Sequence, residues 1–270
     1  MTDFILRAFL LTTHEFFIVA LITFGYLMSK SDVRPIFGRA LMILTFTMVF
    51  NPWLKSLWQI PLLPSLGKVG WSFPSGHTQA AFALYGWLAW EFRQRWLYLT
   101  VLVLLGGIGW GLVHFGYHRP VDIPGGILFG LISFLAYYYV LQTPLGKKQN
   151  LPLLGLLLFA VGWGFVAAIP GRAPAHMAMA QGALLGFSLG CLWNKRFTFL
   201  NWPVRLFNVA LALGGASTLN FMFSDIKSNS SEFLAHFLLE GMVAFWIIGC
   251  APKLGPLLLR VKHREQYEAS

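Results

Sequence analysis

The stretch Phe73-Pro74-Ser75-Gly76-His77 interrupts an apolar sequence immediately before a new apolar run begins at Thr78. The order proline, serine, glycine and histidine predicts the start of a helix, with Ser75 as its capping residue. The first turn of a helix leaves backbone N–H groups unpaired, and the helix dipole places positive potential there. We therefore expect an anion such as phosphate to bind at this helix start, with His77 beside it as a titratable proton donor.

The composition of the chain is that of an integral membrane protein. Its 270 residues are 57% hydrophobic and 11% charged, and the mean hydropathy is +0.64, far from a soluble globular profile. We predict an all-α, polytopic membrane bundle, in which about nine apolar stretches are long enough to cross a bilayer. These stretches are residues 9–28, 38–54, 76–92, 97–114, 123–142, 151–169, 176–193, 204–223 and 233–252. The first is expected to be a retained helix, because no A-x-A-like cleavage site follows Arg7.

The net charge of +10 is explained by membrane topology. When alternate loops are assigned to one side, fourteen basic residues share that side: Lys30, Arg34, Arg39, Arg93, Arg95, Lys147, Lys148, Lys195, Arg196, Arg205, Lys253, Arg260, Lys262 and Arg264. Six lie opposite: Arg7, Lys55, Lys68, Arg119, Arg172 and Lys227. The positive-inside rule then predicts an outer N-terminus and a cytoplasmic C-terminus. We expect a bacterial cytoplasmic (inner) membrane, with His77 on the periplasmic face, and no nucleic-acid partner.

A second polar cluster, Val113–Asp122, is expected on the same outer face as His77. His118 and Asp122 are four residues apart, so they share a face if the fifth helix begins at His118. The carboxylate would then accept from one imidazole nitrogen and hold one tautomer. The other nitrogen of His118 would be free to act as nucleophile or base, and His77 could supply the complementary acid.

These two motifs, Phe73–His77 and His118-x-x-x-Asp122, resemble the type 2 phosphatidic acid phosphatase superfamily over about residues 50–142. The resemblance implies that His118 attacks phosphorus and forms a phosphohistidine, that Asp122 orients it, and that His77 protonates the leaving group. It implies no metal and no cofactor. Lys55 matches the lysine of the family's first motif, and Ser75 and Gly76 belong to the phosphate cradle. Residues 1–142 would form the family's membrane core, with its motifs within 50–126, and residues 143–270 a C-terminal extension of four helices.

The chain departs from the family pattern at two arginines. Leu62 stands where the first motif has its arginine, and Leu112 stands where the third motif has one. Arginine holds phosphate through bidentate, charge-assisted bonds, so a standard phosphoryl site should be severely weakened by this loss. Other groups on the outer face are candidates to replace the arginines: Lys55, Lys68, Arg119 and Arg172.

Three functions stay open from the sequence. The first is an outer-face phosphatase that acts on a lipid phosphate or diphosphate headgroup. The second is a headgroup phosphotransferase of the same superfamily. A phosphodiester substrate carries one negative charge fewer, so it needs less positive charge from the protein, which fits the missing arginines. The third is a non-catalytic lipid-binding or transport protein. All three have the bilayer and a lipid with a phosphorylated headgroup as partners, and the sequence leaves the lipid and the oligomeric state open.

Other polar and small residues have structural interpretations. His236 and Glu240, four apart in the last span, are expected to pair with each other. Gly182, Gly186 and Gly190 predict close helix packing. Cys191 and Cys250 are expected near cytoplasmic helix ends, with neither a disulfide nor a zinc site.

Overall fold

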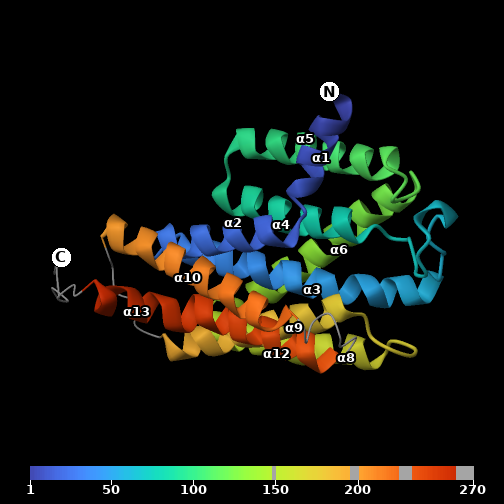
Figure 1. Cartoon of the computed structure of the whole chain (residues 1–270). Coiled ribbons are helices and arrows are strands. Elements are labelled where there is room, and N and C mark those ends of the chain that lie inside the picture. The colour runs from blue at the N-terminus through green and yellow to red at the C-terminus, as the bar shows by residue number, and fades with distance from the viewer. Residues whose placement is uncertain (148–149, 195–200, 225–232, 260–270) are drawn as a thin grey trace.

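The protein is an all-helical bundle across the residues that the computed structural model describes, 1–147, 150–194, 201–224 and 233–259 (Figure 1). The helices are α1 (Thr2–Leu11), α2 (Glu15–Met28), α3 (Arg34–Trp58), η1 (Pro64–Leu66), α4 (Gly76–Phe92), α5 (Arg95–His114), α6 (Asp122–Gln142), α7 (Pro144–Lys147), α8 (Leu151–Ala167), α9 (Ala175–Trp193), α10 (Trp202–Met222), α12 (Phe233–Phe245), η2 (Trp246–Cys250) and α13 (Ala251–Leu258). The predicted all-α class is confirmed for this part of the chain.

By length and composition, five helical segments can cross a membrane, or six if the bent pair α1 and α2 is counted as one span. The chain is thus an integral membrane protein. Among the nine predicted stretches, those of α4, α8 and α10 do not meet this test, so the count of nine and the orientation stay predictions. Seven of the charges used for the orientation lie outside the described residues: Lys148, Lys195, Arg196, Lys227, Arg260, Lys262 and Arg264.

The first predicted span, residues 9–28, is not one continuous helix. It is broken between α1 and α2, whose axes differ by 54°. The hydroxyls of Thr12 and Thr13 donate to the carbonyls of Phe9 and Leu10 at 2.6 and 2.7 Å, and these bonds satisfy the end of α1. His14 has extended backbone angles, so the helix stops and restarts at Glu15.

Helix α3 runs through the middle of the bundle and contacts α2, α4, α6, α8 and α9 (Figure 1). Its antiparallel neighbour α4 is joined to it at both ends. At one end Asn51 donates to Gln79 Oε1 at 2.8 Å. At the other end, Arg39 and Glu91 form a bidentate ion pair with N–O distances of 2.6 and 3.0 Å. These contacts fix the position of the start of α4 along the axis of α3.

The second predicted span ended at residue 54, but α3 continues through Pro52 to Trp58. A proline inside a helix removes one backbone hydrogen bond and costs stability. Here aromatic packing supports the segment, because Phe50 and Trp53 stack on each other and both meet Phe165 of α8 edge-on. The helices after residue 142 thus stabilise the end of α3 that leads into the His77 region.

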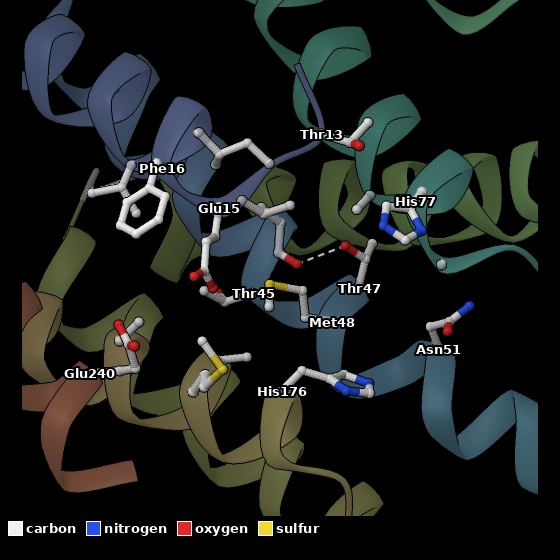
Figure 2. A pocket seen from close by; sticks show the side chains of 18 of the residues that line it. Thr13, Glu15, Phe16, Thr45, Thr47, Met48, Asn51, His77, His176 and Glu240 are labelled. Carbon is white, nitrogen blue, oxygen red and sulfur yellow. Dashed lines mark hydrogen bonds between the residues drawn. The ribbon is translucent and has the colours of Figure 1, made fainter. Parts of the chain in front are cut away.

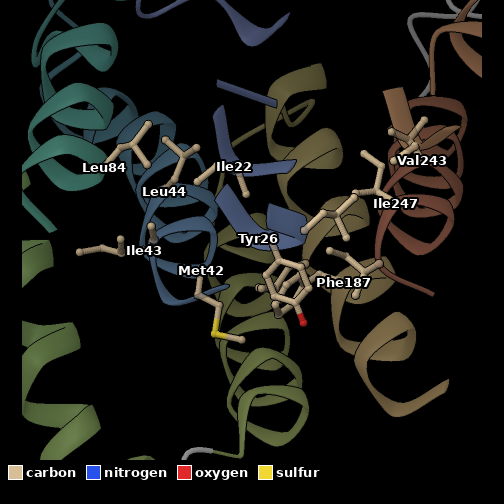
Figure 3. Close-up of a cluster of buried hydrophobic side chains, with 14 of the residues drawn as sticks. Ile22, Tyr26, Met42, Ile43, Leu44, Leu84, Phe187, Val243 and Ile247 are labelled. Carbon is tan, nitrogen blue, oxygen red and sulfur yellow. The ribbon is translucent and has the colours of Figure 1, made fainter. Parts of the chain in front are cut away.

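One hydrophobic cluster joins the two halves of the chain (Figure 3). It includes Ile22 of α2, Met42 of α3 and Leu84 of α4 together with Phe187 of α9 and Val243 of α12. Both cysteines are free. Because the core is continuous, side chains from helices far apart in the sequence can meet in one site.

The glycines of α9 pack against α12, as their spacing predicted. A Cβ atom at Gly182 would collide with the backbone carbonyl of Phe237, and one at Gly186 would collide with that of Gly241. Gly190 lies instead against the side chain of Ile248 in η2, with 3.0 Å from an added Cβ to the Ile248 Cβ. Small residues allow this close approach of two helix backbones in a membrane.

Candidate active site

The segment Pro74–His77 forms the start of α4, as predicted. Ser75 is the N-cap, and its Oγ accepts from the backbone N of Thr78 at 3.4 Å and from the Thr78 hydroxyl at 3.1 Å. The segment is held by Asn51 Nδ2, which donates to Pro74 O at 3.1 Å, and by Ser75 N, which donates to Asp122 O at 3.0 Å. The Ser75 hydroxyl is therefore buried as a helix cap, whereas Gly76 and His77 line a cavity.

His118 and Asp122 are in contact, although not within one helix as the sequence suggested. Helix α6 begins at Asp122, and His118 lies in the turn before it. His118 Nδ1 donates to Asp122 Oδ2 at 3.1 Å, and the backbone N of Arg119 donates to the same oxygen at 2.9 Å. Ser72 Oγ is 3.5 Å from Asp122 Oδ1. The fully buried carboxylate thus fixes both the turn and the imidazole.

His77 faces His118 across a short gap. The two ring centroids are 6.5 Å apart and the rings are inclined by 69°. With Nδ1 of His118 bonded to Asp122, the Nε2 lone pair is left for chemistry. Burial lowers the pKa of His118, while its hydrogen bond to Asp122 raises that pKa in part. The net direction is downward, which keeps the imidazole neutral near pH 7.

Both histidines open onto a cavity of about 1000 Å³ (Figure 2). Its wall is mostly apolar and comes from both halves of the chain: α2, α3 and α4, the 62–71 segment, and α9, α10, α12 and η2. Such a volume is at the upper end of ordinary ligand pockets. The arrangement places two imidazoles at the wall of a large apolar chamber.

Of the candidate cations, Lys55 and Lys68 line this cavity. Lys55 projects from α3 and interacts electrostatically with Asp122, whereas Lys68 is an exposed residue of the segment between α3 and α4. Arg119 and Arg172 are not among the lining residues. The Arg119 guanidinium donates to Pro61 O at 3.1 Å, and Arg172 is exposed in the turn between α8 and α9. The structure thus brings the two lysines, but not the two arginine side chains, to the wall of the cavity that the histidines line.

The two leucines at the arginine positions have different surroundings. Leu62 lines the cavity. Leu112 is 2% exposed and packs in an apolar cluster with Ala81, Leu105 and Ile108. A guanidinium at position 112 would be buried among hydrocarbon side chains here, which is costly for an unpaired charge. The surroundings of Leu112 therefore suit an apolar side chain and not a charged one.

Other polar residues reach the cavity that the sequence did not assign to it. His176 enters from α9, Glu15 from α2 and Glu240 from α12 (Figure 2). No local motif marks them, because the three helices meet only in the folded bundle. Glu240 was expected to pair with His236, and that pairing stays a prediction. Within the described ranges no group of three or more His, Cys, Asp or Glu side chains is arranged to hold a metal ion.

Comparisons with known proteins point to one family. Residues 16–145 match the family model described as PAP2 superfamily. A protein of Escherichia coli provisionally named undecaprenyl-diphosphatase YbjG is 35% identical over 78 residues, which are 28% of this chain and 38% of the relative. The lipid A 4'-phosphatase of Bacteroides thetaiotaomicron is 27% identical over 129 residues, which are 48% of this chain and 54% of the relative.

The chain thus spans about half or less of the length of these curated relatives. No solved structure matches it significantly. The matched segment includes both histidines, Asp122 and Lys55, and it ends before α8 begins. The family match and both relatives agree with the motifs around His77 and His118, which confirms the resemblance: residues 16–145 of this chain match the PAP2 superfamily of type 2 phosphatidic acid phosphatases.

Proposed function

We propose that the protein is a membrane lipid phosphatase that removes a phosphate from a lipid phosphate or diphosphate headgroup through a phosphohistidine. The observation that carries this proposal is the contact of His118 with Asp122 beside His77, at the wall of a cavity that also contains Lys55. The names of both relatives describe phosphatases that act on lipids. The apolar wall of the cavity suits a substrate with hydrocarbon chains.

In the first step, the Nε2 lone pair of His118 attacks phosphorus and a P–N bond forms. The bond from phosphorus to the lipid oxygen breaks, and this oxygen takes a proton from the imidazolium of His77. A bound phosphate anion favours that protonated form of His77. Asp122 keeps the Nδ1 proton in place and stabilises the positive charge that develops on the His118 ring.

In the second step, water attacks the phosphohistidine. His77, now neutral, takes a proton from this water, the P–N bond breaks, and inorganic phosphate leaves. Lys55, Lys68 and the backbone N–H groups at the start of α4 offset the phosphate charge. With the proton from water His77 is an imidazolium again, so each residue is back in its starting protonation state.

The side of the membrane is part of this proposal. The end of the bundle with His118 and the 59–75 segment is opposite to the end with Arg39, Glu91 and Arg95 (Figure 1). The positive-inside rule puts Arg95 in the cytoplasm and the histidines outside. Single cysteines at positions 95 and 119 test this in intact cells: a membrane-impermeant thiol reagent should label Arg119→Cys and spare Arg95→Cys. Labelling in the reverse pattern would place the site on the cytoplasmic face.

A trapping experiment tests the mechanism. The purified protein is mixed with a lipid carrying ³²P in its phosphate, quenched in base, which preserves phosphohistidine, and the labelled peptide is mapped. We expect label on His118 in the wild type and none in His118→Ala. Release of phosphate by His118→Ala at the wild-type rate would end the phosphohistidine proposal, because the reaction would then proceed without that nucleophile.

Transfer to a second lipid is the alternative that one observation favours. No arginine is among the described residues that line the cavity, and a phosphodiester headgroup would need less positive charge than a monoester. Product analysis separates the two reactions. Free inorganic phosphate from a lipid phosphate in the absence of any acceptor supports hydrolysis, whereas turnover only after an acceptor lipid is added supports transfer.

A further inference from the structure

The cavity beside His77 is completed by helices that lie beyond the family match. The matched segment ends at residue 145, and α9, α10 and α12 follow it in the chain yet supply a large part of the cavity wall. Helix α9 approaches α3 closely, so its first turn lies near the start of α4. The chemistry of the site can therefore draw on residues after 145.

One polar group of α9 reaches the polar end of the cavity. His176, the second residue of the helix, enters the cavity from the side opposite to His77 (Figure 2). It is close enough to interact electrostatically with Lys55 and His77. Within the described part of the chain, the His176 imidazole forms no hydrogen bond or ion pair. His176 is exposed, and the space that its side chain faces is the cavity.

The charge of the expected substrate explains why such a residue is useful. A phosphate monoester carries about −1.5 to −2 near pH 7. Among the described lining residues the basic side chains other than histidine are Lys55 and Lys68. Lys68 is exposed on a segment that projects from the bundle, and the arginine positions hold Leu62 and Leu112. A hydrogen-bond donor on the wall opposite His77 would add a contact to the phosphate from a direction other than that of His77.

We propose that His176 binds the phosphate group of the substrate together with Lys55, so that a helix outside the family segment replaces the arginines missing from within it. This inference rests on the proposed function. His176 is a phosphate-binding residue here and takes no part in the transfer of protons or of the phosphoryl group. The helices after residue 145 are then needed to complete the phosphate site as well as to support the bundle.

The test uses the full-length protein purified in detergent, with inorganic phosphate and vanadate as probes. For His176→Gln we expect the inhibition constant of each anion, and the KM for a lipid phosphate, to rise roughly ten- to hundredfold, as for the loss of a charged hydrogen-bond partner. The kcat should change less, because binding to substrate and transition state is lost together. His176→Arg should restore anion affinity to within about threefold of wild type, since a guanidinium binds phosphate well.

His114→Gln is the matched control, because His114 lies at the same end of the bundle but outside the cavity and pairs with Asp3 at 2.8 Å. It should leave all constants unchanged. Anion affinity unchanged in His176→Gln, with an unchanged thermal midpoint, would overturn the inference. So would an arginine variant that binds anions no better than the glutamine variant.

The proposed function and this inference fail in different ways. A wild-type protein that binds phosphate through His176 but releases none from any lipid would keep the binding site and overturn the hydrolase. If the His176→Gln variant hydrolyses lipid phosphate as well as the wild type does, the hydrolase proposal stands and the role of His176 is overturned. No binding of phosphate or vanadate to the wild type would overturn the role of His176, while phosphate release from a lipid phosphate decides the hydrolase separately.

Discussion

Replacing Asp122 by asparagine tests how the structure controls the imidazole of His118. The carboxylate is fully buried and receives three donors: His118 Nδ1 at 3.1 Å and Arg119 N at 2.9 Å on Oδ2, and Ser72 Oγ at 3.5 Å on Oδ1. Asparagine keeps the shape of the side chain but exchanges one oxygen for an NH₂ group. The effect depends on which of the two positions that NH₂ group takes.

The backbone N–H of Arg119 decides the orientation of the amide. With the amide oxygen in the place of Oδ2, it accepts from both His118 and Arg119, and the NH₂ group can donate to the Ser72 hydroxyl. The reverse orientation turns the NH₂ group toward the Arg119 N–H and leaves buried donors without acceptors, at about 1–3 kcal/mol for each. We therefore expect His118 to keep its tautomer in Asp122→Asn and to lose only the negative charge beside it.

The expected loss follows from this argument. A hydrogen bond to a charged partner contributes about 1.5–3 kcal/mol, which corresponds to roughly a 10- to 150-fold decrease in kcat/KM. A triad in which asparagine enforces the wrong tautomer loses about 10⁴ in kcat. Asp122→Ala removes the acceptor for His118 and Arg119 altogether, so we expect a loss of at least about 10³-fold, close to that case.

The assay is phosphate release from a lipid phosphate in mixed micelles, with the thermal midpoint measured for each variant. Asp3→Asn is the control, since Asp3 forms a similar carboxylate–histidine contact with His114 but its side chain is 67% exposed; its activity should not change. An Asp122→Asn variant as inactive as Asp122→Ala would refute the orientation argument. Activity within threefold of wild type would remove Asp122 from the mechanism.

Four further predictions concern pH, helix packing and the Arg39–Glu91 ion pair. Burial lowers the pKa of His118 below its ordinary value of about 6.5, so the acid limb of kcat/KM that reports His118 should be centred below that value. An acid limb centred above pH 7 would contradict this. In Asp122→Asn the same limb should move to still lower pH, because the hydrogen bond that raises the pKa is weakened. Gly186→Val should lower the thermal midpoint strongly, since its side chain meets the backbone of Gly241, and a midpoint equal to wild type would show that α9 and α12 can separate freely. Glu91→Gln, which leaves the Arg39 guanidinium half-paired, should destabilise the protein by about 1–3 kcal/mol without changing kcat/KM of the folded fraction, as measured by thermal unfolding and activity on the same preparation.

The sequence by itself was enough for the membrane class, the helix start at Pro74–His77 and the pairing of His118 with Asp122. Each of these depends on residues that are near one another in the chain. A serine caps the N–H groups within its own turn, and a carboxylate four residues after an imidazole can reach it. Apolar stretches of sufficient length likewise mark a membrane protein wherever they pack.

Other local expectations depended on competing bonds that the sequence did not reveal. Residues 9–28 read as one apolar span, yet Thr12 and Thr13 bond back to the carbonyls of α1 and allow the break. His118 and Asp122 were expected on one helix, but their contact runs through a turn closed by the Arg119 N–H. Such backbone contacts override a periodic pattern, because buried polar groups must find partners.

Only the tertiary structure decided which side chains share the cavity. Arg119 follows His118 directly, yet its guanidinium bonds to Pro61 O outside the cavity wall, while His176, far along the chain, faces His77 across it. Leu112 of α5 occupies an arginine position of the family but is buried in an apolar cluster with Ala81 of α4. The direction of a side chain is set by how its helix packs against its neighbours, and for α3, α4 and α9 that packing joins residues from both halves of the chain.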